Sequence, residues 1–375
     1  MIKRPTRPYQ MCNRCIMDTV DDPDIVFDAK GNCNYCNSYY QMVKTNEEQK
    51  HNLKSKLPEL IEKIKGSNVN GPYNCILALS GGADSSYMAY KVKEMGLRPL
   101  AVHDDNNWNS EKSVHNIELL VKKLNMDLYT HVNDWEEFKD IQLAFFKANV
   151  IDLEIVTEQA WIATLYKVAK KYGIKYMLTG HNRNTEFILP KHWYHYKIDI
   201  LNIKSIHKKF GTMKMKKYPM VGFFTKWYSE KFKTIESVSF LDYIDYNKED
   251  AKKLLQEKIG WQDHGWKHFE SVFTRFYQAY ILPRKFGVDK RKAHLSTLIC
   301  SGQITREMAL EEMKKPPYNE QQMQEDKLYV IKKLGFTEES FEKYIREPQK
   351  SHLDYGSYMK LHFKILKFLG KDLGY

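Results

Sequence analysis

Short apolar runs alternate with longer amphipathic segments between residues 74 and 180. The short runs have the length of buried strands and occupy residues 75–79, 98–102, 128–132 and 176–178. In the longer segments apolar residues recur at helical spacing, at residues 83–95, 111–124, 136–148 and 158–172. Strands that alternate with helices predict a doubly wound α/β fold, in which a parallel sheet carries helices on both faces.

The pattern outside this region predicts further parts. An amphipathic helix is expected over residues 46–65, and residues 183–225 are weakly periodic, so an elaborated loop with a late strand is expected there. After about residue 235 the pattern is helical, with predicted helices at residues 250–258, 267–280, 305–313, 321–334 and 357–369. We therefore predict an N-terminal tail with a cysteine module, a helical linker, an α/β domain and a helical C-terminal domain, at residues 1–45, 46–73, 74–235 and 236–375.

Polar clusters follow three of the predicted strands. They are residues 80–86, called the Ser80 loop below, residues 103–107 and residues 179–182. Ligands of parallel α/β sheets bind outside the carboxyl ends of the strands. The three clusters are therefore expected to meet in one binding site.

The Ser80 loop has the composition of a phosphate site. It reads Ser-Gly-Gly-Ala-Asp-Ser-Ser from Ser80 to Ser86, between a predicted strand and a predicted helix. Gly81 and Gly82 permit backbone conformations and close approaches that a Cβ would block. N–H groups at the following helix N-terminus favour an anion, the hydroxyls of Ser80, Ser85 and Ser86 add donors, and Asp84 can hold a Mg²⁺ ion. No Gly-Lys-Ser/Thr follows, so the loop is not a Walker A motif.

Four of the six cysteines form two Cys-x-x-Cys pairs. The pairs are Cys12 with Cys15 and Cys33 with Cys36. Four thiolates on two tight turns suit a tetrahedral structural zinc site, with a redox or iron–sulfur role as the alternative. Cys75 and Cys300 are interpreted as ordinary small residues.

Length and charge narrow the class of protein. A chain of 375 residues can hold two or three domains, and its net charge of +12 suits a polyanionic partner: nucleic acid, a nucleotide-linked substrate or an anionic membrane surface. No apolar run approaches the ~20 residues of a membrane span, and no signal peptide is recognisable. A cytoplasmic protein is expected.

The motifs together resemble one enzyme family. The Ser80 loop resembles the pyrophosphate loop (PP-loop) of the ATP pyrophosphatases. Together with the cysteine pairs it is similar to the N-acetyl sugar amidotransferases of surface-polysaccharide (lipopolysaccharide O-antigen) and nonulosonic-acid biosynthesis. The resemblance covers roughly residues 11–313 and is carried by residues 11–19, 33–36, 80–86, 266–271 and 280–291.

The resemblance implies a reaction and its residues. ATP would be cleaved to AMP and pyrophosphate while the acetamido oxygen of a nucleotide-linked sugar is adenylated, and ammonia would then displace AMP to leave an acetamidino group. The implied nucleotide-binding residues are Ser80, Gly81, Gly82, Asp84, Ser85, Ser86, His103, Asp104, Thr179, Gly180 and His181. The implied catalytic residues are Asp84, Lys285, Lys290 and Arg291, with Arg284 as a further candidate for neutralising phosphate. His181 is open to a structural role, and Glu158 to that of a favourable charge at a helix N-terminus.

The source of ammonia and one alternative function also follow from these residues. Neither Cys75 nor Cys300 lies in the sequence context of a glutaminase triad. Ammonia is therefore expected from solution or from a separate glutaminase subunit, which in this family is accompanied by a barrel-like, cyclase-related companion. Residues 193–196 and the lysine-rich residues 204–217 are candidates for docking that subunit. The alternative is a transfer-RNA thiolase, which shares the zinc knuckles and the loop but ordinarily needs two further catalytic cysteines, or a cluster site, near the nucleotide. Nucleic acid is accordingly the less favoured partner.

Overall fold

The computed structural model describes residues 7–266 and 269–360, and its centre is a five-stranded parallel sheet. The strands are β1 (Cys75–Ala78), β2 (Pro99–Asp105), β3 (Asp127–Val132), β4 (Tyr176–Thr179) and β5 (Glu236–Ser239), in the spatial order β3-β2-β1-β4-β5. The chain moves outward from β1 to β3 and then returns to place β4 on the other side of β1. The switch point of the sheet therefore lies between β1 and β4, which is where doubly wound sheets bind ligands.

Helices cover both faces of the sheet because its central strand is apolar on both sides. Cys75 and Leu77 of β1 face a core that includes α3 (Ala83–Glu94), α4 (Glu111–Lys123) and α10 (Lys248–Ile259). Ile76 and Ala78 face the opposite core, built largely on α6 (Ile155–Tyr172). Burial on both faces gives the continuous apolar run that marks a parallel strand. The predicted α/β fold is confirmed.

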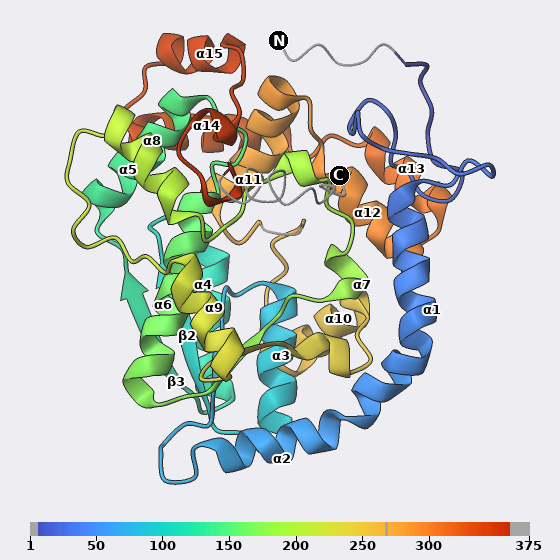
Figure 1. Cartoon of the computed structure of the whole chain (residues 1–375), viewed down its shortest axis with the longest axis vertical. Helices are drawn as coiled ribbons and strands as arrows, with labels where there is room; N and C mark the ends of the chain where they lie inside the picture. Colours follow the sequence, from blue (N-terminus) through green and yellow to red (C-terminus); the bar gives the residue numbers. More distant parts are fainter. Residues whose placement is uncertain (1–6, 267–268, 361–375) are drawn as a thin grey trace.

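The remaining elements surround this sheet (Figure 1). They are α1 (Asn34–Ser55), α2 (Leu57–Ser67), α5 (Trp135–Ala148), α7 (Arg183–Glu186), α8 (Ile200–Phe210), α9 (Phe223–Phe232), α11 (Val272–Phe276), α12 (Lys290–Cys300), α13 (Arg306–Lys314), α14 (Glu320–Leu334) and α15 (Glu338–Arg346). A π-helical segment spans Tyr277–Phe286, and 3₁₀ turns span Lys191–Trp193, Phe240–Tyr243 and His352–Asp354. Helices α1 and α2 form an arc along one side of the molecule, and they carry the chain from the cysteine module to the sheet.

The helical C-terminal region packs against α5 through an aromatic cluster. Phe146 of α5 contacts Phe273, Phe336 and Tyr344, with ring centroids 4.9–6.1 Å apart. Such pairs add stabilisation beyond the area that they bury. Helices α14 and α15 lie together at one end of the molecule (Figure 1), and Tyr344 belongs to α15. The cluster holds the C-terminal helices beside the carboxyl ends of the strands.

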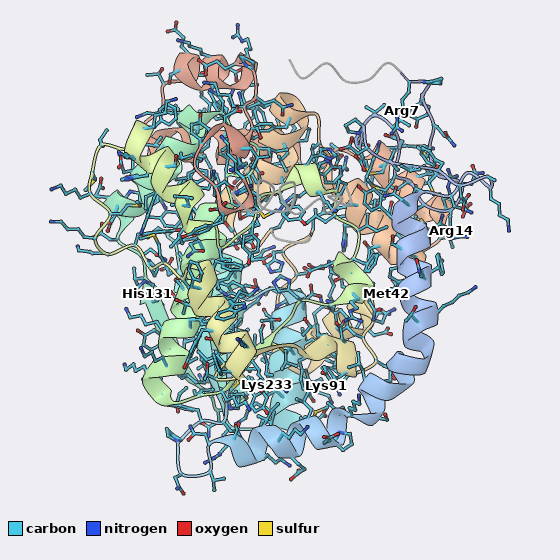
Figure 2. The ribbon with its side chains drawn as sticks, viewed as in Figure 1. Arg7, Arg14, Met42, Lys91, His131 and Lys233 are labelled. Atoms are coloured by element: carbon cyan, nitrogen blue, oxygen red, sulfur yellow. The ribbon has the colours of Figure 1, made fainter. Side chains whose placement is uncertain are left out.

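The N-terminal module docks on α12 and α13. The guanidinium of Arg306 donates hydrogen bonds to the carbonyls of Cys12 and Cys15, both at 3.2 Å, and the backbone N–H of Ile16 donates to Ser296. Arg14, labelled in Figure 2, lies over the ring of Tyr40 in α1 at 4.5 Å. The module is thus fixed to the C-terminal helices although almost 300 residues separate them in the sequence.

Several expected elements differ in the structure. The helix expected over residues 46–65 is two helices, of which α1 begins at Asn34. Residues 183–225 form α7 and α8 and begin α9, and the late strand follows them as β5. Strand β5 lies at the edge of the sheet and reads Glu-Ser-Val-Ser, so the sequence has no apolar run there that would predict a strand. The helix expected over 267–280 begins at Val272, and α12 and α15 were not predicted. The predictions for residues 1–6, 267–268 and 361–375 lie outside the described residues, and the division into domains stays a prediction.

One charge pair is buried inside this helical region. Arg275 of α11 donates to both carboxylate oxygens of Asp326 in α14, at 2.7 and 2.8 Å, and both residues are less than a tenth exposed. The pair fixes α11, and therefore the segment that follows it, against α14.

No helix in the described part of the chain has the length and apolarity that a membrane crossing requires.

We expect Asp326→Asn to lower the free energy of unfolding by roughly 3–5 kcal/mol, because the guanidinium of Arg275 stays buried without its counter-charge. The double variant Arg275→Met/Asp326→Leu should lose less than the single variant. Glu59→Gln, which breaks an exposed ion pair with Lys63, serves as the control. Urea denaturation midpoints measure all three. An Asp326→Asn midpoint equal to that of the unaltered protein would contradict this account of the pair.

Candidate active site

A cavity of about 280 Å³ opens at the carboxyl ends of β1 and β4. All three polar clusters singled out in the sequence line it: Ser80, Gly82, Asp84 and Ser85; His103, Asp104 and Asn106; and Thr179, Gly180 and His181. The parallel sheet brings them together because β1, β2 and β4 end at the same edge. The predicted convergence of these residues is therefore present in the structure.

Gly81 sets the path of the Ser80 loop. Its φ is +80°, and a Cβ there would lie 2.5 Å from the carbonyl oxygen of Ser113. Its own carbonyl accepts hydrogen bonds from the Trp261 indole at 2.9 Å and from Asn116 Nδ2 at 3.2 Å. No residue with a side chain fits this turn. Gly81 acts through its backbone and is not itself a wall of the cavity.

The N-terminus of α3 faces the cavity without a side-chain cap. Gly82 is the N-cap residue and supplies no capping hydrogen bond, so the first-turn N–H groups are available to an anion. Ser80 and Ser85 hold the loop closed through their hydroxyls, which are 3.2 Å apart. Ser86, by contrast, is fully buried in α3 and does not line the cavity, so its hydroxyl does not join the expected donors.

Because Gly180 has no side chain, the end of β4 can approach the first turn of α3. A Cβ at Gly180 would lie 2.9 Å from the backbone nitrogen of Ser85, too close for any other residue. The turn after β4 therefore lies directly against the first turn of α3. His181, the next residue, pairs with Glu186 at 2.7 Å and remains largely exposed.

Asp84 is oriented by a residue that the sequence did not indicate. The hydroxyl of Tyr246 donates a hydrogen bond to Asp84 Oδ1. Burial and the neighbouring Asp84 charge raise the pKa of Tyr246 well above its usual value, so the phenol stays protonated and keeps donating. The carboxylate of Asp84 is thus held at the cavity wall. An oxygen ligand in this position suits Mg²⁺ bound with phosphate.

His103 and Asp104 line the cavity, and hydrogen bonds to neighbouring residues hold both side chains in place. Asn109 Nδ2 donates to His103 Nε2 at 3.0 Å, so His103 Nδ1 carries the proton that it donates to the Leu79 carbonyl at 3.1 Å. Burial lowers the pKa of His103, which keeps the ring neutral. Asp104 accepts from Thr164 at 2.8 Å and from Asn133 at 2.9 Å, and burial raises its pKa to about 6.

Glu154 is the functional candidate that sequence reasoning missed. It precedes α6, lines the cavity and accepts a hydrogen bond from Thr274 through Oε2 at 2.9 Å. Its other oxygen, Oε1, is buried and has no hydrogen-bond partner among the described atoms. Burial raises the pKa of Glu154 to about 7. The available signal was the alternation of acidic residues, Asp152 and Glu154, within the apolar run at residues 150–156.

Lys290 stands in the same cavity. It begins α12, and burial together with the charge of Lys197 lowers its pKa. Lys197 itself is held by Asp152 at 2.8 Å and by Glu158 at 3.1 Å. Glu158, treated in the sequence as a helix-end charge, is therefore an ion-pair partner. The arrangement leaves Glu154 and Lys290 as the buried acid and base without an ion-pair partner of their own among the described residues.

A second cavity of about 410 Å³ adjoins the first. The two share the walls Glu158, His181, Glu186, Trp266, Gln278 and Lys290. The second adds Tyr194, Phe269, Arg291 and His294, a mixture of rings and cations. The Arg291 guanidinium is fixed there by three hydrogen bonds that it donates to the Asp289 carboxylate, the shortest at 2.7 Å. Aromatic and cationic side chains around one cavity suit a ring-shaped anionic ligand.

Two expected phosphate ligands lie elsewhere. The Lys285 ammonium donates to the backbone carbonyl of Glu347 at 2.8 Å and to that of Tyr344, and burial lowers its pKa to about 8. Arg284 lies over the ring of Tyr280 at 3.8 Å. Neither lines either cavity. The π-helical segment directs both side chains toward α14 and α15, so of the expected basic residues only Lys290 and Arg291 reach the cavities.

The four paired cysteines form a separate buried cluster. The sulfurs of Cys12, Cys15, Cys33 and Cys36 lie within 4.8 Å of one another, as a single metal ion requires. Backbone N–H groups of Arg14, Cys15 and Cys33 donate to Cys12 Sγ at 3.2–3.4 Å. Cys300, expected to be an ordinary residue, places its sulfur 3.5 Å from that of Cys36.

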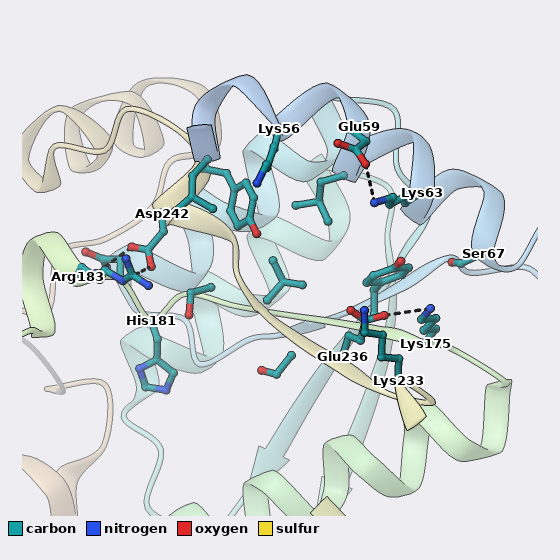
Figure 3. Close-up of a pocket in the computed structure, with 18 of the residues that line it drawn as sticks. Lys56, Glu59, Lys63, Ser67, Lys175, His181, Arg183, Lys233, Glu236 and Asp242 are labelled. Carbon is teal, nitrogen blue, oxygen red and sulfur yellow. Dashed lines mark hydrogen bonds and ion pairs between the residues drawn. The ribbon is translucent and has the colours of Figure 1, made fainter. Parts of the chain in front are cut away.

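A larger groove of about 1260 Å³ lies between α2 and β5 (Figure 3). Its charges are mostly matched: Lys63 pairs with Glu59, Lys175 with Glu236 and Arg183 with Asp242, at 2.6–3.4 Å. It meets the first cavity at His181 and Glu186. The residues of the Ser80 loop do not line it, so the smaller cavity is the candidate active site.

One segment expected to dock a partner, residues 193–196, is partly buried. Trp193 is fully buried, its indole donating to the Asp21 carbonyl at 3.0 Å, and His195 is buried against Asp199 at 2.9 Å. Tyr194 lines the second cavity. Trp193 and His195 therefore belong to the interior, whereas Tyr194 is exposed and Tyr196 is half-buried, so only part of this segment is available for docking.

The C-terminal part of the chain matches a family of known proteins. Residues 270–369 match the family described as LPS biosynthesis protein WbpG-like, C-terminal domain. An uncharacterized protein of Methanocaldococcus jannaschii, MJ1599, is 24% identical over 307 residues, which cover 81% of this chain and 93% of that protein.

More distant similarities concern shorter stretches. A tRNA-specific 2-thiouridylase (MnmA 2) of Fusobacterium nucleatum is 25% identical over 122 residues, 30% of this chain and 34% of that enzyme. Among solved structures, the NMN synthetase of Francisella tularensis aligns with a TM-score of 0.29 and 15% identity, over 62% of this chain and 92% of that one. The C-terminal region, residues 270–369, is therefore similar to the WbpG-like lipopolysaccharide biosynthesis proteins, in agreement with the surface-polysaccharide family that the motifs of this chain resemble.

Proposed function

We propose that this chain is an ATP-dependent amidotransferase that converts the acetamido group of a nucleotide-linked sugar to an acetamidino group. The observation that carries the proposal is the pair of joined cavities. One has the open helix N-terminus, Asp84 and the Ser80 loop; the other has rings and cations; and Lys290 belongs to both. The WbpG-like domain supports a role in lipopolysaccharide O-antigen biosynthesis, and the related nonulosonic acids are the other product class.

ATP would bind in the first cavity with its phosphates against the first turn of α3. The uncapped N–H groups and the helix dipole stabilise the negative charge that develops on pyrophosphate. Asp84 would hold Mg²⁺, which neutralises phosphate charge when bound. The second cavity would hold the nucleotide-linked sugar, with Arg291 and His294 facing its anionic portion. The acetamido oxygen would then meet the α-phosphorus where the cavities join, beside Lys290.

Glu154 suits the proton transfers that this chemistry requires. When the amide oxygen bonds to the α-phosphorus and pyrophosphate leaves, the acetamido nitrogen gives up its proton to the Glu154 carboxylate. The carboxyl returns that proton to the same nitrogen when ammonia adds to the carbon. It then takes the proton that the added ammonia releases, and AMP leaves with the former amide oxygen. A group with a pKa near 7 can both accept and return a proton at neutral pH.

A separate glutaminase subunit with a barrel-like companion is the proposed source of ammonia. Almost all free ammonia is protonated at neutral pH and is then not nucleophilic, and the adenylated intermediate is open to hydrolysis. A partner that releases ammonia at the mouth of the cavity raises its local concentration. The isolated chain should therefore use ammonium salts but not glutamine.

A tRNA-modifying ATP pyrophosphatase is the second candidate. Partial similarity to a tRNA-specific 2-thiouridylase favours it, over 30% of this chain. The net charge of +12 also suits RNA. No cysteine lines either cavity, although thiolation ordinarily uses two there. Sulfur incorporation into transfer RNA is the assay that would support it.

The products of the reaction test the proposed activity. With ATP, Mg²⁺, labelled ammonium and a panel of nucleotide-linked N-acetyl sugars, the chain should release AMP and pyrophosphate and exchange one sugar oxygen for labelled nitrogen, as mass spectrometry reports. Asp84→Asn should lower the rate by about a hundredfold or more, because it removes charge from the phosphate site. Asp245→Asn, which alters an exposed aspartate, is the matched control. Release of ADP and phosphate would refute the proposed reaction.

Substitution of Glu154 separates a functional from a structural role for this residue. The pKa of about 7 in the folded protein exceeds the usual value near 4.3, so ionisation of Glu154 destabilises the fold as pH rises through this interval. Glu154→Gln should therefore be more stable than the unaltered protein at pH 8, by on the order of 2–4 kcal/mol, with the difference shrinking toward pH 5. Amidine formation should nevertheless fall by about a hundredfold.

Asp152→Asn is the contrast for that measurement. Despite the burial of Asp152, the charge of Lys197 holds its pKa below the usual value, so removing this charge should lower stability at neutral pH. The charged groups that face Glu154 are Lys197, Lys290 and Glu158, and Thr274 donates to it. A Glu154→Gln variant that is both less stable at pH 8 and fully active would exclude the proposed role.

We further propose that the cysteine cluster holds one structural Zn²⁺ ion in a reducing, cytoplasmic compartment. Cys33→Ser should lower zinc content and soluble yield together, because so short a module buries too little core to fold without metal. Cys300→Ser should keep the zinc, since Cys300 lies outside the group of four. Elemental analysis of both variants decides the matter. Iron with acid-labile sulfide in place of zinc would contradict the assignment.

A further inference from the structure

Helix α9 exposes an aromatic face that neither the sheet nor the active site uses. Five large side chains are 42–72% exposed there: Phe223, Phe224, Trp227, Tyr228 and Phe232. Among the described side chains of the helix only Ser229 is buried. At 100° per residue the five rings span half of the helix circumference. Soluble surfaces seldom gather so many exposed rings without a partner.

The sequence around this helix is strongly basic. Residues 208–233 contain eight lysines and a single acidic residue, Glu230. These residues supply more than half of the excess positive charge of the chain, which is +12. Lys231 lies over the Trp227 ring at 4.7 Å, within the aromatic face, and Lys233 follows the end of the helix (Figure 2). The partner of this surface must therefore be anionic as well as apolar.

We propose that α9 and its flanking lysines bind the surface of an anionic lipid bilayer. Trp, Tyr and Phe on one face with lysines beside them are the composition of helices that lie in the membrane interface. Long lysine side chains in an aromatic face can extend to the headgroups while the rings enter the boundary of the acyl chains. None of the five rings lines either active-site cavity, so such binding leaves the candidate site open.

The observations favour a lipid surface over RNA. Proteins that bind single-stranded nucleic acid stack bases on rings set within a groove. Here the rings project from an exposed helix and include three phenylalanines, which offer no hydrogen bond to a base or phosphate. A bilayer satisfies both properties at once, because it presents negative headgroups above an apolar interior.

Co-sedimentation of the full chain with lipid vesicles tests the proposal. The chain should bind vesicles of equimolar phosphatidylcholine and phosphatidylglycerol, bind phosphatidylcholine alone more weakly, and lose affinity as salt rises. Phe224→Ser/Trp227→Ser should reduce the partition coefficient by more than about tenfold, since two rings no longer enter the interface. Leu328→Ser/Met308→Ser, which removes two exposed apolar side chains elsewhere, is the matched control and should bind normally.

A second measurement reports insertion directly. Brominated lipids should quench tryptophan fluorescence in the unaltered chain, and the single variant Trp227→Phe, which keeps the ring surface, should bind equally but lose most of this quenching. Absence of vesicle binding would overturn the proposal. So would vesicle binding that both double variants retain, or a gel shift with transfer RNA that requires Phe224 and Trp227 in a chain that does not bind vesicles. None of these assays involves ATP or the sugar, so their outcome is independent of the proposed enzyme activity.

Discussion

Two close backbone approaches determine the geometry of the candidate active site. The Cα of Gly81 lies against the carbonyl of Ser113, and that of Gly180 lies against the backbone nitrogen of Ser85. Both positions exclude a side chain, one by clash and positive φ and the other by clash alone. Because of them the end of β1, the end of β4 and the first turns of α3 and α4 occupy one small volume. The uncapped N–H groups of α3 become a phosphate site only because the neighbouring strand ends bring polar side chains to it.

The second organising feature is the distribution of buried charge beside that volume. Lys197 is satisfied by Asp152 and Glu158, and Arg275 by Asp326, so these charges fix α6, α11 and α14 in place. Glu154 lines the first cavity and Lys290 lines both, and their pKa values are displaced toward neutrality. A carboxyl and an amine in such surroundings can exchange protons at little cost, whereas fully paired charges cannot. The paired charges thus stabilise the fold, whereas Glu154 and Lys290 are suited to chemistry.

The C-terminal region connects these features to the N-terminal module. Helix α12 supplies Lys290 to the cavities, and its other end places Cys300 beside the cysteine cluster. The Arg306 hydrogen bonds to Cys12 and Cys15 join the same module to α13. A change in the cysteine cluster would therefore reach the cavity wall through one short helix. The cysteine module can therefore affect the structure of the candidate site, although none of the cysteines in the module lines the cavities.

The sequence by itself determined the α/β class, the Ser80 loop and the grouping of the four cysteines. Each of these is carried by local spacing: apolar periodicity, a glycine turn before a helix, or two Cys-x-x-Cys pairs. Only the tertiary structure decided that Lys290 enters the cavity while Lys285 turns away. The two are five residues apart, but a π-helical segment ends between them and a new helix begins. Glu154 and Tyr246 were hidden for the same reason. Side-chain direction and burial depend on how distant helices pack, and no local pattern in the chain records that packing.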